Sequence, residues 1–152
     1  MNLEELERKV KTLEDIEAIK NMHRNYIFLL RDSQFDEMTD CFVENATAEI
    51  RTFGVRSGKE EIARLFKEDI AKVKIPRGHA LVQPVITIEG DTAKGHWMMC
   101  TFNHDYTAPA GMGRLIECES GRYDCEYVRE GGKWKFSYLK WTCPWPEQQG
   151  RS

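Results

Sequence analysis

Apolar side chains recur at every third or fourth position through the first thirty residues, which is the spacing of one face of a helix. Leu3, Leu6, Val10 and Leu13 begin this stripe and resemble a short coiled-coil seam. The pattern predicts a helix over residues 3–30. A helix of about 28 residues is long for a globular protein, so we expect its first turns to project and pack on another subunit.

Three shorter elements are predicted between residues 32 and 75. A second helix is indicated by four side chains that share a face: Phe35, Met38, Cys41 and Phe42. Residues 46–54 alternate as a strand, with Ala48, Ile50 and Thr52 on one side. Ser57 and Glu60 form a capping box, which predicts the start of a third helix. That helix has an apolar stripe of Ile62, Leu65, Phe66, Ile70 and Val73.

The second half of the chain has the pattern of two β-hairpins. Residues 79–89 and 92–105 flank a Glu-Gly-Asp turn, and residues 114–129 and 133–143 flank a Glu-Gly-Gly turn. The segment 108–113, Ala-Pro-Ala-Gly-Met-Gly, connects the hairpins as a flexible loop. Helices followed by long strands predict an α+β fold, with helices on one face of a mostly antiparallel sheet that encloses a pocket.

Composition and charge exclude several classes of protein. The 152 residues carry a net charge of −3 and are 41% hydrophobic and 31% charged, so we expect no nucleic-acid partner. No apolar run approaches the ~20 residues of a membrane span, so we expect no membrane partner. The charged, amphipathic N-terminus does not have the pattern of a signal peptide. Five cysteines without CxxC spacing predict reduced thiols and a cytoplasmic location.

The chemical motifs of metal and phosphate sites are not found. The four histidines (23, 79, 96 and 104) lack HxH, HExxH or CxxC contexts, so we expect no metal. There is no glycine-rich phosphate loop and no GxSxG nucleophile motif. The sequence therefore predicts a protein that works without a cofactor.

Three segments together resemble a known superfamily. They are "DIEAIKNMHRNYIFLLRDSQFDEMTDCFVENATAEI", "GHALVQPVITIEGDTAKGHW" and "SGRYDCEYVREGGKWKFSYLKW". The chain resembles the SnoaL-like and scytalone-dehydratase-like branch, which includes bile-acid dehydratases, of the nuclear transport factor 2-like (NTF2-like) superfamily. The resemblance implies a cone-shaped α+β barrel with a cystatin-like fold. We expect a projecting extension over residues 1–13, one domain over 14–145 and a flexible tail over 146–152.

The resemblance implies two catalytic residues, Tyr26 and His79. In dehydratase-like relatives a tyrosine of the first helix and a histidine at the start of a strand face one pocket. A phenol can polarise a carbonyl group, and an imidazole can remove an α-proton and return it to a leaving hydroxyl. The alternative for each residue is structural, because a buried tyrosine or a lone histidine is often part of the core.

Position 31 departs from the family pattern. Dehydratase-like relatives have an aspartate there, which orients the histidine, whereas this sequence has Arg31. A guanidinium near His79 lowers the pKa of the imidazole. Asp32 lies one helical step away, turned by about 100°. Arg31 is either a contact for an anionic group of the substrate or, with Asp32, part of a solvated helix end.

Further contacts are expected on the strands. By alternation, Trp97 and Thr101 share the face that the resemblance assigns to the pocket, and Tyr123 matches a pocket tyrosine. Thr101 stands near a carboxylate position of the bile-acid dehydratases and cannot act as a base. The pair His104-Asp105 is either an acid/base pair at the rim or an ordinary polar loop end.

The predicted function is therefore a cofactor-independent dehydratase (a lyase) or isomerase that acts on an apolar cyclic substrate, such as a polyketide, steroid or aromatic compound. The alternative is a non-catalytic ligand-binding or accessory domain, for example one like the beta subunit of a ring-hydroxylating dioxygenase. We expect a homo-oligomer, either a dimer or a trimer. The projecting helix and an outward sheet face with Arg122, Lys135, Leu139 and Trp141 would form its interfaces.

Overall fold

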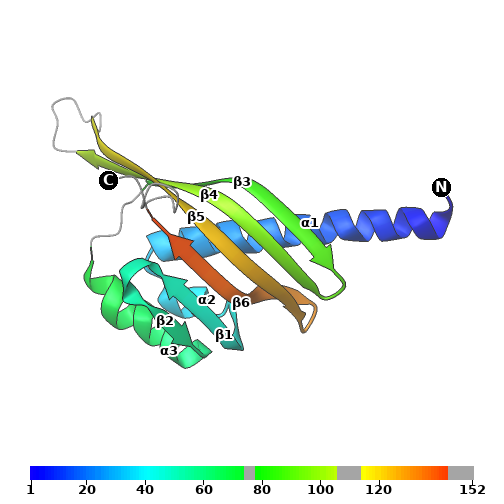
Figure 1. The fold of residues 1–152 in the computed structure, drawn as a ribbon, viewed down its shortest axis with the longest axis horizontal. Helices are drawn as coiled ribbons and strands as arrows, with labels where there is room; N and C mark the ends of the chain where they lie inside the picture. The colour runs from blue at the N-terminus through cyan, green and yellow to red at the C-terminus, as the bar shows by residue number, and fades with distance from the viewer. Residues whose placement is uncertain (74–77, 106–113, 144–152) are drawn as a thin grey trace, which may run out of the picture.

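A curved six-stranded sheet forms the centre of the computed structural model, and helices lie against one of its faces (Figure 1). The structure describes the backbone of residues 1–73, 78–105 and 114–143 and the side chains of residues 1–73, 78–102 and 118–143. The helices are α1 (Leu3–Arg31), α2 (Phe35–Thr39) and α3 (Lys59–Arg64), the last continued by a π-helical stretch (Leu65–Asp69) and a 3-10 turn (Ile70–Lys72). The strands are β1 (Phe42–Ile50), β2 (Val55–Ser57), β3 (Gly78–Glu89), β4 (Thr92–Asp105), β5 (Arg114–Glu130) and β6 (Lys133–Thr142).

The strands lie side by side in the order β2-β1-β6-β5-β4-β3. Only the pair β1 and β6 is parallel among these neighbours, and the other four pairs are antiparallel. Because β2 and β3 remain as edges, the sheet is open rather than closed into a barrel. The helix α1 contacts β3 and β6, and α3 packs on β1. The predicted α+β fold with a mostly antiparallel sheet is confirmed.

The long first helix is also confirmed, and its ends have local causes. The Asn2 side chain caps the N-terminus by accepting a hydrogen bond from the backbone N–H of Glu5 at 2.8 Å. At the other end Ser33 takes a left-handed conformation with φ of 57°, which reverses the chain. The part of α1 from Asp15 onward faces the sheet, and its buried residues are Asp15, Ile19, His23, Tyr26, Ile27 and Leu30.

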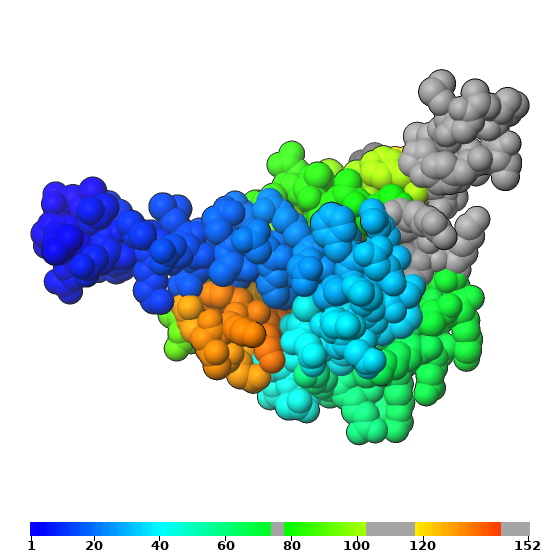
Figure 2. Space-filling model, turned by 180° about the vertical axis from the view of Figure 1, so that it is seen from behind, coloured from blue at the N-terminus to red at the C-terminus, as the bar shows by residue number. Residues whose placement is uncertain are grey.

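The N-terminal turns of α1 project from the body of the molecule. Figures 1 and 2 show its initial turns standing clear of the sheet and of the other helices. The apolar seam on these turns is accordingly exposed: Leu3, Leu6, Val10 and Leu13. The packing of this seam on another subunit stays a prediction.

The region after α1 differs from the sequence prediction. The second helix ends at Thr39, and Phe42 begins β1 instead of completing a helical face. The Phe42 ring is buried against Phe136 at 5.1 Å, and the neighbouring Cys41 carbonyl accepts a hydrogen bond from the Phe136 N–H. These contacts with a strand almost a hundred residues away outweigh the local helical spacing.

A tight turn splits the predicted strand 46–54 in two. The strand β1 ends at Ile50, Arg51 has φ of 43°, and the chain returns as β2, which the sequence did not predict. The capping box is also wrong, because Ser57 pairs with Thr47 in the sheet and Gly58 occupies the N-cap of α3.

Both hairpins of the second half are confirmed. Gly90 has φ of 62° and Gly131 has φ of 58°, the left-handed conformations that tight hairpin turns require. Alternation also places the predicted pocket-facing residues of β4 and β5 in the interior: Ala93, Gly95, Trp97, Met99, Thr101, Gly121, Tyr123, Cys125 and Tyr127.

The last strand changes face at a β-bulge. Phe136 pairs with Tyr127 and Tyr138 with Glu126, so Ser137 is an extra residue that opposes none on β5. Alternation across the bulge then places Leu139 and Trp141 in the core and turns Tyr138 outward. The expectation that Leu139 and Trp141 belong to an outward face is therefore wrong.

Some expectations lie outside the described residues. These are the helix end at Pro76 and Arg77, the connecting loop 108–113, the tail 146–152, and the side chains of His104 and Asp105. Among the helices that the structure describes, none is long and apolar enough to cross a bilayer.

Candidate functional site

An interior cavity of about 380 Å³ lies between the helices and the sheet. Its walls come from α1, from the turn that follows β1, from the segment that follows α3, and from all of the long strands. Its apolar lining residues are Leu30, Ile50, Phe53, Phe66, Ile70, Val73, Met99 and Trp141, and its polar ones are Tyr26, Arg51, Thr52, His79, Thr101, Glu119, Tyr123 and Cys143. The structure thus brings the predicted Tyr26, His79, Thr101 and Tyr123 around one cavity.

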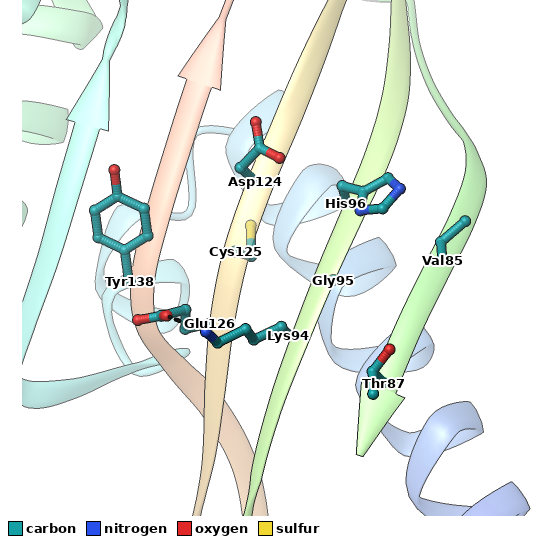
Figure 3. Close-up of a pocket in the computed structure, with 9 residues that line it drawn as sticks. All are labelled: Val85, Thr87, Lys94, Gly95, His96, Asp124, Cys125, Glu126 and Tyr138. Carbon is teal, nitrogen blue, oxygen red and sulfur yellow. Dashed lines mark ion pairs between the residues drawn. The ribbon is translucent and has the colours of Figure 1, made fainter. Parts of the chain in front are cut away.

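A second hollow, of about 460 Å³, lies on the opposite face of the sheet (Figure 3). Figure 3 shows α1 behind the strands, while Lys94, His96, Glu126 and Tyr138 project from the outer face. Lys94 and Glu126 form an ion pair at 3.6 Å across the strands. The side chains around this outer hollow are largely exposed, whereas the interior cavity gathers buried titratable groups, so the interior cavity is the candidate site.

Tyr26 and Tyr123 form the deepest polar part of the cavity. Tyr26 comes from α1 and Tyr123 from β5, and both are almost completely buried. Burial raises the pKa of each phenol well above its usual value, and neighbouring Cys125 raises both further. Each phenol therefore stays neutral at pH 7 and can donate a hydrogen bond to a substrate oxygen.

His79 stands at the start of β3, directly opposite Thr101 of β4. Burial lowers the pKa of its imidazole, and the charge of Arg31 lowers it further, so the ring is neutral at pH 7. The effect of Arg31 on this pKa agrees with the sequence prediction. The Nδ1 atom is buried and has no hydrogen-bond partner among the described residues.

Glu119 is a carboxylate that the sequence analysis missed. It pairs with Thr101 across β4 and β5, so His79, Thr101 and Glu119 form one row over three neighbouring strands. The alternation that places Gly121 and Tyr123 inside, extended by one step, includes Glu119. Its Oε2 lies 3.6 Å from Sγ of Cys143, which donates to it.

Arg51 is the second charged residue of the lining that was missed. It lies in the turn between β1 and β2, a segment that the sequence pattern assigned to a continuous strand. No local signal distinguished Arg51 from other surface arginines. Its charge lowers the pKa of the Cys143 thiol, although burial, the larger effect, leaves that pKa raised.

Two predicted contacts, Arg31 and Trp97, lie outside the described lining of the cavity. Arg31 is exposed, and its Nε lies 3.3 Å from Oδ1 of Asp32, with the guanidinium above the Phe28 ring. It acts on His79 through its charge and does not line the site. Trp97 is buried beneath the cavity wall, where its Nε1 donates a hydrogen bond to Tyr127 at 3.0 Å.

A buried histidine supports the wall behind the two phenols. His23 is completely buried, and its ring packs edge-on against Tyr123 at 4.9 Å and Phe136 at 4.9 Å. Its Nδ1 lies 3.0 Å from the Tyr127 hydroxyl. Burial lowers the pKa of His23 to about 3, so the ring is neutral. It is not among the residues that line the cavity, and it serves as an aromatic core residue.

Gly121 allows the cavity wall to close. A Cβ atom at this position would lie only 2.1 Å from the Trp141 ring and 2.5 Å from the Thr142 carbonyl oxygen. The indole of Trp141 therefore lies over Gly121 and stacks near Tyr123 at 4.9 Å. Within the described part of the chain, no three His, Cys, Asp or Glu side chains lie close enough to share a metal ion.

Comparisons with known proteins agree with this architecture. The model of the SnoaL-like domain family matches residues 11–140. An NTF2-like protein with a cystatin-like fold from Novosphingobium aromaticivorans is 21% identical, with a TM-score of 0.69 over 92% of this chain and 88% of that chain. A protein proposed to be a scytalone dehydratase, from the same organism, is 18% identical, with a TM-score of 0.69 over 88% and 86% of the two chains.

A hexachlorocyclohexane dehydrochlorinase, LinA-type3 from Novosphingobium barchaimii, is 17% identical, with a TM-score of 0.68 over 88% of this chain and 89% of that chain. At these identities the likeness establishes the fold. None of the curated proteins compared with the chain shows significant similarity to it.

Proposed function

Because the chain belongs to the family of SnoaL-like domains, we propose that its interior cavity binds an apolar cyclic small molecule and converts it by dehydration or isomerisation, without a cofactor. The observation that carries this proposal is the meeting of one neutral imidazole, His79, with two neutral phenols, Tyr26 and Tyr123, in a mostly apolar cavity. Two of the similar structures bear the names of a dehydratase and a dehydrochlorinase, both eliminating enzymes.

The chemistry follows from the protonation states of these groups. Tyr26 and Tyr123 donate hydrogen bonds to a carbonyl oxygen of the substrate and stabilise the enolate that forms when the α-proton leaves. His79 accepts that proton, and the C–H electron pair becomes the new C=C bond of the enolate. In dehydration the imidazolium then protonates the β-hydroxyl as the C–O bond breaks and water leaves. In isomerisation it returns the proton to another carbon.

A non-catalytic ligand-binding role is the second candidate, and one observation favours it. The buried Nδ1 of His79 has no partner in the described part of the chain, and Arg31 stands where the resemblance to dehydratases implies an orienting aspartate. An imidazole without that acceptor has no fixed tautomer, which weakens it as a base. Binding needs only the apolar walls and the phenol donors.

Exchange of α-protons for deuterium separates the two candidates, because it detects proton abstraction without a known substrate. Cyclohexanone and 1-tetralone are incubated with the protein in D2O, and the α-proton signal is followed by NMR. We expect the wild type to accelerate exchange, His79→Gln to abolish the acceleration, and Tyr26→Phe to reduce it. The matched control is His96→Gln, because His96 projects from the outer face of the sheet.

The outcomes are distinct. Acceleration that is lost in His79→Gln, reduced in Tyr26→Phe and kept in His96→Gln supports the enzyme. Binding of a ketone without any faster exchange overturns the catalytic role and leaves ligand binding. Equal loss in His96→Gln would mean that the variants act through folding and not through the site.

A further inference from the structure

The polar groups of the interior cavity are ordered by depth. Tyr26 and Tyr123 are almost fully buried at its inner end, whereas Arg51 and Glu119 are exposed and therefore mark its mouth. Among the described lining residues these two carry the full charges, because His79 is neutral at pH 7. A ligand in this cavity thus meets charge at one end and neutral donors at the other.

The turn between β1 and β2 holds Arg51 in an unfavourable backbone conformation. Its φ of 43° lies in the left-handed region, which a residue with a side chain seldom occupies. A backbone hydrogen bond from the Ile50 N–H to the Gly54 carbonyl closes the same turn at 3.4 Å. Such conformations persist where the surrounding structure fixes them, and they are common at ligand sites.

The guanidinium of Arg51 has no ion-pair partner in the parts of the chain that the structure describes. Glu119 does not neutralise it, because the Glu119 carboxylate contacts the Cys143 thiol instead. Both charges act on that thiol in opposite senses, since Arg51 lowers its pKa and Glu119 raises it. The cation and the carboxylate therefore both act on Cys143, and no ion pair joins them among the described residues.

We infer that Arg51 binds a carboxylate of the substrate at the mouth of the cavity. This inference rests on the proposed function and names its substrate class: a cyclic acid with one or two apolar rings and, at the far end, an oxygen that accepts hydrogen bonds from Tyr26 and Tyr123. The planar fork of Arg51 suits a carboxylate, which it can hold by two hydrogen bonds. A volume of about 380 Å³ is at the small end of the range for ligand sites, which fits one or two rings.

A matched pair of probes tests this inference directly. 6-Hydroxy-2-naphthoate carries a carboxylate at one end and a hydroxyl at the other, and 6-hydroxy-2-naphthamide has the same shape without the charge. Their affinities are measured by titration calorimetry at pH 7.5. We expect the acid to bind more tightly, and Arg51→Gln to weaken it about tenfold, the usual cost of one charge-assisted hydrogen bond, with no effect on the amide.

Three further variants sharpen the test. Glu119→Gln removes a like charge from the mouth, so it should strengthen binding of the acid about two- to threefold. Arg31→Gln removes the arginine that the sequence suggested as the contact for an anionic group. Arg64→Gln removes an exposed arginine of α3 that pairs with Glu60 and Glu61. Neither should change the ratio of acid to amide affinity. The preference for the acid should also shrink as salt is raised from 50 to 500 mM, because the mouth is exposed.

Each outcome decides the question. Equal affinities for acid and amide in the wild type, or a preference that disappears in Arg31→Gln and survives in Arg51→Gln, would overturn the inference. Neither result touches the proposed function, which is measured by proton exchange on uncharged ketones. If neither probe nor any ketone binds, both proposals are wrong.

Discussion

A buried ion pair fastens the first helix to the hairpin of β5 and β6, and its removal should destabilise the fold. Asp15 of α1 is 7% exposed and accepts two hydrogen bonds from Arg129, at 2.9 and 2.8 Å, and a third from Nε1 of Trp134 at 3.1 Å. The Arg129 guanidinium also lies over the Trp134 ring at 4.6 Å and bonds to Asp91. The perturbation is Asp15→Asn, which keeps the shape of the side chain and removes its charge.

The magnitude follows from the contacts. Breaking a fully buried pair costs about 3–5 kcal/mol, because the remaining charge stays buried. Here Arg129 is partly exposed and keeps Asp91, so we expect the free energy of unfolding to fall by about 3 kcal/mol, the lower end of that range. For a chain of this length that corresponds to a melting temperature about 6–12 °C lower.

The loss should also depend on pH. The hydrogen bonds from Arg129 hold the pKa of Asp15 below its usual value, although burial opposes them. A carboxylate with a lowered pKa contributes stability above the pKa of the unfolded chain, about 3.8, and this contribution is lost as pH falls through the folded value. The difference between wild type and Asp15→Asn should therefore be full at pH 7 and should shrink below about pH 4.

Urea unfolding followed by circular dichroism measures both effects. Glu17→Gln is the matched control, since Glu17 lies on the same helix in an exposed pair with Lys20 and should change stability by less than about 0.5 kcal/mol. If Asp15→Asn were no less stable than this control at pH 7, the ion pair would not fasten the helix. A difference that persisted unchanged in acid would refute the electrostatic explanation.

Two further predictions concern His79 and the first helix. Arg31→Gln should raise the pKa of His79, as followed by NMR titration of its ring protons, because the charge of Arg31 lowers that pKa; an unchanged midpoint would contradict this coupling. Deletion of residues 2–12 should reduce the assembled mass in sedimentation, because the exposed seam on α1 is the expected contact with another copy. A monomer at micromolar concentration, with or without these residues, would show that the chain does not assemble.

The parts of the fold that depend on local rules could be predicted from the sequence. The helix over residues 3–31 follows from the spacing of its apolar residues, and the two hairpins follow from glycines that can adopt positive φ, such as Gly90 and Gly131. Alternation placed the interior residues of β4 and β5 correctly. In each case the determining information lies within a few neighbouring residues.

The wrong assignments share a different cause, because each depends on contacts between distant segments. Phe42 starts a strand through its contact with Phe136, and Ser57 pairs with Thr47 instead of capping a helix. The bulge at Ser137 moves every following side chain of β6 to the other face, and no residue type near it marks that shift. Periodicity alone could not have detected these features.

The residues of the candidate site also divide into those that local patterns could predict and those that depend on contacts between distant segments. Tyr26, His79, Thr101 and Tyr123 were placed by the family resemblance together with alternation, and the structure gathers them around one cavity. Glu119 follows from the same alternation, taken one step further. Arg51 could not have been found, because its position depends on a turn in a segment that reads as a continuous strand.

Arg31, which stands where the resemblance to dehydratases implies an aspartate, has opposite effects on the two halves of the proposed reaction. Burial lowers the pKa of His79 and the charge of Arg31 lowers it further, which makes the neutral ring a weaker base, so removal of the α-proton becomes harder. The same shift makes the imidazolium a stronger acid, so return of the proton to a leaving hydroxyl becomes easier. Such a site suits substrates whose α-proton is already acidic, and the two phenol donors supply part of that acidity by stabilising the enolate. The elimination step then gains from Arg31 what the abstraction step loses.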